Sequence, residues 1–139
     1  MKGAGVLTGD TLIEESTLIV GGAGATGLLN VKGNLDLMDT TVKMEIAGAA
    51  KCDTIECTKG TLSTAGTKVE VTLIGAPQFA VGNTLELFKV SGEGASWQNP
   101  FPEASVSVPN PGGGLTFAKV YLPPGNPPNN YNGFSLKVE

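Results

Sequence analysis

The stretch Gly33–Gly48, GNLDLMDTTVKMEIAG, decides the fold, because Gly60–Gly75, GTLSTAGTKVEVTLIG, repeats its pattern. A shift of 27 residues carries Gly33 onto Gly60. The same shift places most apolar residues of the first stretch on apolar residues of the second: Leu35 on Leu62, Val42 on Val69, Met44 on Val71 and Ile46 on Leu73. A fixed period of roughly 20–50 residues is typical of proteins that stack successive coils over one continuous core. The sequence therefore predicts a short parallel β-solenoid.

Apolar and polar residues alternate within both copies. In Val42–Ile46 and in Val69–Leu73 every second residue is apolar, and the residues between them are charged or hydroxylated. A period of two is typical of strands that bury one face. The 27-residue shift also places Lys43 beside Glu70, so we expect an opposite-charge pair on the solvated side of the stack.

The rest of the chain divides into weaker copies and a different C-terminal part. Residues 6–20 read as a degenerate first copy and residues 79–92 as a third, shortened one, whereas residues 100–139 alternate Pro- and Gly-rich turns with short strands. We expect an all-β chain with a solenoid over residues 1–99 and a β cap over residues 100–139 that closes one end. Alternating strands also suit two packed sheets, so a jelly-roll-like β-sandwich is the alternative fold.

Composition excludes several classes of function. The chain has no His and no Arg, and nine Lys face thirteen carboxylates for a net charge of −4. We therefore expect no nucleic-acid partner, because binding there depends on neutralising phosphates. No apolar run is long enough to span a bilayer. No signal peptide is visible, which leaves a cytoplasmic protein or a piece whose leader is missing.

Two short motifs lend themselves to cofactor or thiol chemistry. Cys52 and Cys57 form either a disulfide across a short turn or two unpaired thiols, and without His they build no zinc site. Gly22-x-Gly24-x-x-Gly27 matches a dinucleotide-binding fingerprint in form, but a strand-like pattern follows it where that fingerprint needs a helix. We therefore expect a loop there, and no cofactor and no metal.

The candidate contact residues are aromatic. Tyr131, Tyr121 and Trp97 could present rings to a glycan or a partner, with Tyr131 the most exposed of them. For Trp97 and Phe101 we favour the alternative that they plug the end of the solenoid where the cap begins. Six carboxylates are candidates for an acid or base role, namely Asp36, Asp39, Asp53, Glu56, Glu70 and Glu86. Pairs of them could serve a glycoside hydrolase. Their spacing instead indicates that most lie on the solvated faces of strands, so we expect no catalytic residue among them.

Residues 28–98 resemble the C-terminal β-helix repeat region of bacterial autotransporter-type surface proteins. The resemblance begins with Leu29–Leu37 and Val42–Gly48. It continues with Asp53, Ile55 and Cys57 leading to Gly60-Thr61-Leu62, then Val69–Leu73, then Gly82-Asn83-Thr84-Leu85-Glu86-Leu87. It implies a right-handed parallel β-helix, export, and a role in adhesion or structural display, and it brings no catalytic residues. The β-barrel translocator of such proteins has no counterpart in this sequence.

These patterns together favour a non-enzymatic structural module of the cell surface or extracellular space. Such a module would self-associate into a homo-oligomer or filament by adding strands at a sheet edge. The alternative is an adhesin-like module that binds glycans or a host surface, and a polysaccharide-active β-helix enzyme is the third hypothesis.

Overall fold

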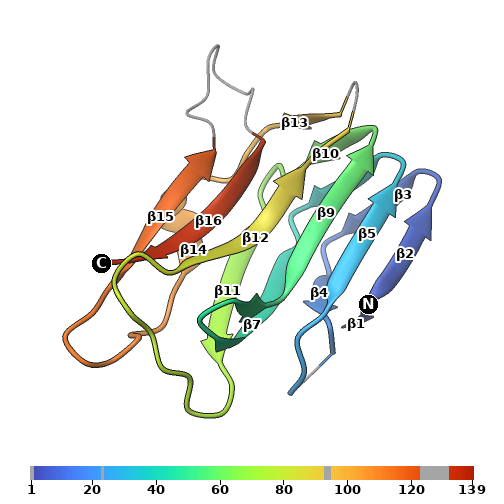
Figure 1. Ribbon diagram of the computed structural model, residues 1–139. Coiled ribbons are helices and arrows are strands. Elements are labelled where there is room, and N and C mark those ends of the chain that lie inside the picture. The colour runs from blue at the N-terminus through green and yellow to red at the C-terminus, as the bar shows by residue number, and fades with distance from the viewer. Residues whose placement is uncertain (1, 23, 93–94, 123–131) are drawn as a thin grey trace.

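The computed structural model describes residues 2–22, 24–92, 95–122 and 132–139, and in this part of the chain it is all-β, with one 3₁₀ turn, η1 (Glu103–Ser105). The strands form three sheets that wind around one core (Figure 1). Sheet A contains β1 (Lys2–Gly3), β4 (Thr17–Val20), β7 (Thr41–Gly48), β11 (Lys68–Leu73) and β14 (Val106–Ser107), with β8 (Lys51–Cys52) against β7. Sheet B contains, in spatial order, β2 (Gly5–Thr8), β5 (Leu28–Lys32), β9 (Thr54–Lys59), β12 (Thr84–Val90), β16 (Gly133–Val138) and β15 (Phe117–Leu122). Sheet C contains β3 (Thr11–Glu14), β6 (Leu35–Met38), β10 (Thr61–Ser63) and β13 (Ser96–Gln98).

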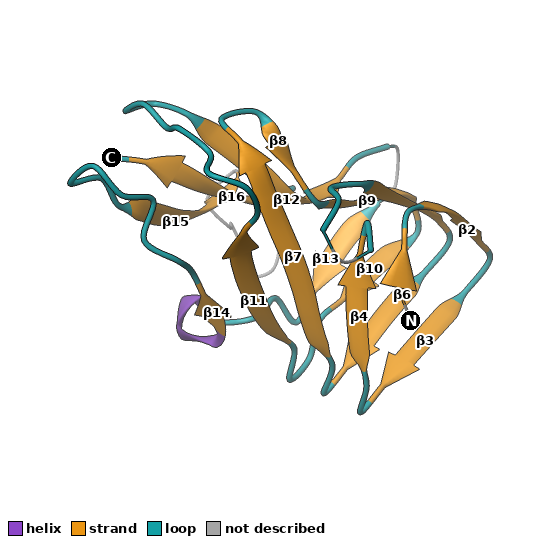
Figure 2. Ribbon diagram, turned by 90° about the horizontal axis from the view of Figure 1, so that it is seen from below, coloured by secondary structure: helices purple, strands orange, loops and turns teal. Residues whose placement is uncertain are grey.

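The chain passes through sheets B, C and A in turn, and each passage makes one coil. Four coils follow one another, β2-β3-β4, β5-β6-β7, β9-β10-β11 and β12-β13-β14, with parallel pairing between corresponding strands. Figure 2 shows β4, β7 and β11 side by side in sheet A. The predicted β-solenoid is therefore confirmed, and three largely parallel sheets exclude the two-sheet jelly roll.

The sequence repeat sets the register of the stack. Val42 pairs with Val69 and Leu35 with Leu62, as the 27-residue shift predicts. The degenerate first copy is also a coil, although Thr17 pairs with Thr41 at a shift of 24 residues. Each coil places like residues above like, so the core consists of apolar columns. Three of them are Leu18-Val42-Val69-Val106, Leu29-Ile55-Phe88 and Leu35-Leu62-Trp97, all buried.

The outward residues are polar and form few strong contacts. Lys43 Nζ lies 3.9 Å from Glu70 Oε2, which confirms the predicted pair, and both side chains are about half exposed. A salt bridge this exposed contributes little stability. Register is fixed by the buried columns, since a slip of one residue would turn them outward.

The last part of the chain reverses direction. β14 pairs in parallel with β11, so the fourth coil continues past residue 100. β16 then pairs antiparallel with both β12 and β15, and a bulge in β12 between Glu86 and Phe88 accommodates the change. Among the described residues there is no helix with the length and apolar character needed to cross a bilayer.

Candidate functional site

An aromatic cluster closes the C-terminal end of the stack. Its five rings, which we call the aromatic cluster, have neighbouring centroids 5.0–5.9 Å apart; they are Phe88, Trp97, Phe101, Tyr121 and Phe134. Trp97 is fully buried, and its indole Nε1 donates a hydrogen bond to Thr64 Oγ1 at 2.9 Å. The Tyr121 hydroxyl donates to the Phe101 carbonyl. Offset and edge-to-face ring pairs of this kind each add about 0.5–1.5 kcal/mol beyond their buried area.

The aromatic contact residues predicted from the sequence are therefore not a surface row. Trp97 is in the core, so its ring meets neither a glycan nor a partner, and the alternative of a plug formed with Phe101 describes its position. Tyr121 is partly buried within the same cluster. Tyr131 lies outside the described residues.

Both cysteines are free thiols in the structure, as in the unpaired alternative. Cys57 is buried in β9, where it pairs with Val31 and Val90 in one core column. Cys52 is partly buried in β8. Burial raises the pKa of Cys52 to about 11 and that of Cys57 to about 12, so both thiols stay protonated at neutral pH. Neither is an activated nucleophile.

Two carboxylates accept hydrogen bonds from backbone N–H groups of the Gly22–Gly27 segment, of which residue 23 lies outside the described residues. Glu45 accepts hydrogen bonds from the Gly24 N–H at 2.9 and 3.0 Å. Asp53 accepts one from the Gly27 N–H and one from the Glu45 N–H, each at 2.7 Å. A strand, β5, follows the loop, so the helix that a dinucleotide fingerprint needs is absent from this described part of the chain.

Asp53 is the one buried carboxylate among the described residues, and it has a structural explanation. Burial raises its pKa to about 6, against the opposing effect of its two backbone hydrogen bonds. Both of its oxygens are engaged by the loop and by β7. It therefore joins two coils and has no free oxygen for an acid or base role.

The other carboxylates do not gather into a catalytic or metal-binding group. Across the described residues, no cluster of three or more His, Cys, Asp or Glu side chains could hold a metal ion. Glu70 pairs with Lys43, and Glu56 Oε2 lies 3.4 Å from Lys89 Nζ. These pairs belong to the outer faces of sheets A and B.

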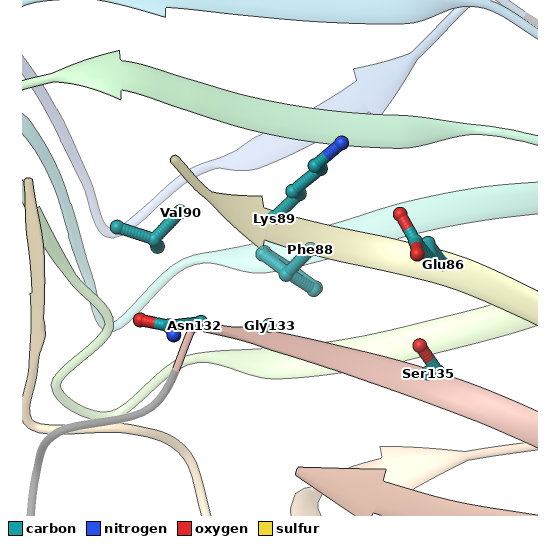
Figure 3. A pocket seen from close by; sticks show the side chains of 7 residues that line it. All are labelled: Glu86, Phe88, Lys89, Val90, Asn132, Gly133 and Ser135. Carbon is teal, nitrogen blue, oxygen red and sulfur yellow. The ribbon is translucent and has the colours of Figure 1, made fainter. Parts of the chain in front are cut away.

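Of the hollows on the described surface, two are lined by a residue that has a buried polar atom without a hydrogen-bond partner. The smaller, of about 220 Å³, lies where β12 and β16 meet and is lined by Glu86, Phe88, Lys89, Val90, Asn132, Gly133 and Ser135 (Figure 3). Ser135 pairs with Glu86 across the strands, and its hydroxyl has no hydrogen-bond partner although the residue is buried. Most ligand sites are larger, at roughly 300–1,000 Å³.

The larger hollow, of about 480 Å³, lies on the outer face of sheet C, and we call it the sheet C groove. Its floor is formed by outward side chains of β6, β10 and β13, together with the turn residues beside them. Asp36, Ser63 and Gln98 form one row across these strands, because Ser63 pairs with both of the other two. The Asp36 Oδ1 atom is buried and has no hydrogen-bond partner.

The opposite, N-terminal end of the stack has open strand edges. β2 and β3 are edge strands of sheets B and C, and each pairs on one side only. Gly9 donates to the Lys32 carbonyl and Thr11 to the Asn34 carbonyl. Because backbone groups alternate in direction along a parallel ladder, the N–H and C=O of Val6 and Leu12 point to the open side. The side chains of Val6 and Leu12 are 58% and 59% exposed.

Neither a protein-family model nor a curated protein matches the chain. The features of the structure that bear on function are the open edges, the aromatic cluster and the sheet C groove. The sequence predicts association through a sheet edge but does not identify β2 or β3, and it does not predict the groove. The absence of Lys from residues 33–38 and 60–66 is the sequence signal that could have marked the groove.

Proposed function

We propose that the chain is a non-enzymatic structural module of a cell surface or extracellular assembly, and that it self-associates through its N-terminal end. The observation that carries the proposal is the contrast between the two ends of the stack. The C-terminal end is filled by the aromatic cluster and covered by the β15–β16 hairpin. The N-terminal end presents β2 and β3 as open edges.

The β2 edge suits pairing with a second copy. Open edges attract further strands, and proteins commonly block them with charges, Pro or bulges. β2 has the sequence GVLT, which contains none of these charges and no Pro. β3 carries Glu14, a charge of the kind that blocks pairing at an edge. We therefore place the contact at β2.

The geometry of such a contact is a two-fold dimer. The open edges at the C-terminal end suit an incoming β2 less well, because β13 has three residues and β14 two, and because β15 carries Lys119, a charge of the kind that blocks an edge. Two β2 edges related by a two-fold axis pair antiparallel and continue sheet B from one copy into the other. A symmetric contact of this kind closes on itself and gives a dimer of the 14.2 kDa chain rather than an open filament.

Sedimentation velocity over a concentration series tests this proposal. The wild-type chain should shift toward twice its monomer mass as concentration rises. Val6→Lys places a charge on the β2 edge without touching the core, and should remove the shift. Val81→Lys is the matched control, because Val81 is also an exposed valine, at 72%, but lies between β11 and β12.

The outcomes separate clearly. A wild-type chain that stays monomeric throughout the series contradicts self-association. A shift that survives Val6→Lys but disappears in Leu12→Lys would move the contact from β2 to β3. Equal effects of Val6→Lys and Val81→Lys would show that net charge, and not the edge, controls association.

A further inference from the structure

We propose that the β2 strands of two copies pair in one defined register, with Leu7 of one copy opposite Leu7 of the second copy. This register belongs to the two-fold dimer described above and therefore rests on the proposed function. β2 lies at the free edge of sheet B and has β5 on its other side (Figure 1). Three properties of β2 select the register: the direction of its backbone groups, the length of its regular part and the position of the Leu7 side chain.

The backbone groups of Val6 and Thr8 point to the open side of β2. The Gly9 N–H donates to the Lys32 carbonyl, so Gly9 faces β5. Because the direction of the backbone groups alternates along a strand, Leu7 also faces β5, whereas Val6 and Thr8 face the open side. A second β2 strand therefore meets the N–H and C=O groups of Val6 and Thr8.

The regular part of this edge is short, because a glycine bounds it on each side. Gly5 and Gly9 have φ angles of 133° and 87°, outside the range of ordinary strand residues. Val6-Leu7-Thr8 is therefore the segment that extends a ladder. With Leu7 on the two-fold axis, Val6 faces Thr8 of the second copy twice, and both pairs exchange their two N–H···O bonds. An axis at Val6 or at Thr8 leaves a single pair of this kind within the segment.

The Leu7 side chain lies on the inner face of β2, where it packs against the core and stays partly exposed. It ends a column that continues through Val31, Cys57 and Val90, all of them buried. In an antiparallel ladder the residues of a pair without hydrogen bonds are closest, with Cα atoms about 4.5 Å apart. Leu7 of the second copy therefore covers the exposed end of the column, and one apolar column runs through both copies.

The side chains of β2 also distinguish it from a protected edge. Natural sheet edges are often blocked by a charged residue that points inward, and β2 has Leu7 in that position. The outward residues Val6 and Thr8 are uncharged and exposed. A second copy in this register therefore brings only uncharged side chains of the two β2 strands together.

The test is a measurement of intermolecular NOEs on the full chain. A mixture of ¹³C-labelled and unlabelled chain is studied at a concentration at which sedimentation velocity shows the dimer. We expect intermolecular NOEs between the Leu7 methyl groups of the two copies, and between Val6 and Thr8. NOEs that place Val6 opposite Val6, or Thr8 opposite Thr8, would overturn the register. A dimer without intermolecular NOEs at β2 would overturn it as well.

Leu7→Ala measures what the shared column contributes to association. The change removes apolar area from both sides of the seam, so the dissociation constant of the dimer should rise by about tenfold or more. Leu28→Ala is the matched control, because Leu28 lies on β5 of the same sheet, points outward and is 46% exposed. Its dissociation constant should stay within about twofold of wild type. Thermal unfolding checks that both variants are folded. An unchanged dissociation constant in folded Leu7→Ala would contradict the Leu7 contact.

Sedimentation velocity separates a wrong register from a failure of self-association. A chain that stays monomeric at every concentration contradicts the dimer, and the register with it. A dimer whose β2 strands meet in a different register leaves the proposed function intact and overturns this register alone.

Discussion

The indole Nε1 of Trp97 donates to Thr64 Oγ1 at 2.9 Å, and both residues are fully buried. Thr64 in turn donates to the Asn99 carbonyl at 2.9 Å. The two bonds tie β10 of the third coil to β13 of the fourth, beneath the aromatic cluster. They hold the largest ring of the core in place at the closed end of the stack.

Thr64→Val should destabilise the fold by about 1–3 kcal/mol, because the valine keeps the shape of threonine but leaves the indole N–H and the Asn99 carbonyl without partners. Urea unfolding measures the change. Thr72→Val, at an exposed position of β11, is the control and should stay within about 0.5 kcal/mol of wild type. Equal stability of the two variants would show that the Trp97 hydrogen bond contributes nothing.

Gly33→Ala should destabilise the stack, because coils touch at this turn. A Cβ on Gly33 would lie 2.2 Å from the carbonyl oxygen of Gly9 in the coil below. Forcing two backbones apart typically costs about 1–3 kcal/mol. Gly48→Ala is the matched control, since its Cβ would meet only the Lys51 Cβ, at 3.8 Å. A thermal midpoint of Gly33→Ala at or above that of Gly48→Ala would contradict the stacking contact.

Asp53 should give the fold an unusual pH dependence. Its pKa is raised from 3.8 to about 6 in the folded chain, so between these values the folded state binds the proton more tightly than the unfolded state. The contribution of Asp53 to stability is therefore greatest below about pH 4 and falls as pH rises to about 6, by up to about 3 kcal/mol. Above about pH 6 the contribution of Asp53 to stability should no longer change with pH.

Comparison with Asp53→Asn isolates this effect from the other carboxylates. Urea unfolding of both proteins at several pH values between 4 and 7 gives the difference in unfolding free energy. Wild type should lose stability relative to the variant as pH rises. A relative gain with rising pH would mean that the two backbone hydrogen bonds keep Asp53 ionised, with its pKa below the usual range.

The thiols should be inert until the chain unfolds. With pKa values of about 11 and 12, Cys52 and Cys57 are almost wholly protonated at pH 8, and Cys57 is also buried. Iodoacetamide should therefore modify the folded chain very slowly, and both cysteines rapidly after unfolding in urea without a reductant. Fewer than two adducts on the unfolded chain would reveal a disulfide.

The sequence predicted the middle of the fold better than its ends. Val42 and Val69 belong to strands with a clear period of two, and a fixed shift between copies is enough to place one above the other. The position of Trp97 could not be predicted in the same way. The long segment between β11 and β12 raises the offset between the third and fourth coils to 33 residues, where Ile55 pairs with Phe88. At β13 the offset is 35 residues, where Leu62 pairs with Trp97, so the 27-residue shift no longer applies.

The sheet C groove could not be predicted from the sequence, for a related physical reason. Its floor joins Asp36, Ser63 and Gln98, which come from three coils and have different side chains. A search for repeats finds positions that have similar residues in successive coils, whereas the three residues of this row occupy equivalent positions with different side chains. The burial of one Asp36 oxygen depends on neighbours that only the three-dimensional stack brings together.

Cysteine cross-linking at the β2 edge tests most directly the central claim, that two copies pair through β2. Val6→Cys and Thr8→Cys each place an accessible thiol on this edge, and Val81→Cys places one on an exposed loop elsewhere. Mild oxidation of each variant, followed by a non-reducing gel, measures the fraction of covalent dimer. We expect Val6→Cys or Thr8→Cys to form dimer much faster than Val81→Cys, because antiparallel β2 strands bring the two thiols close together. Equal, slow dimer formation by all three variants would contradict pairing through β2.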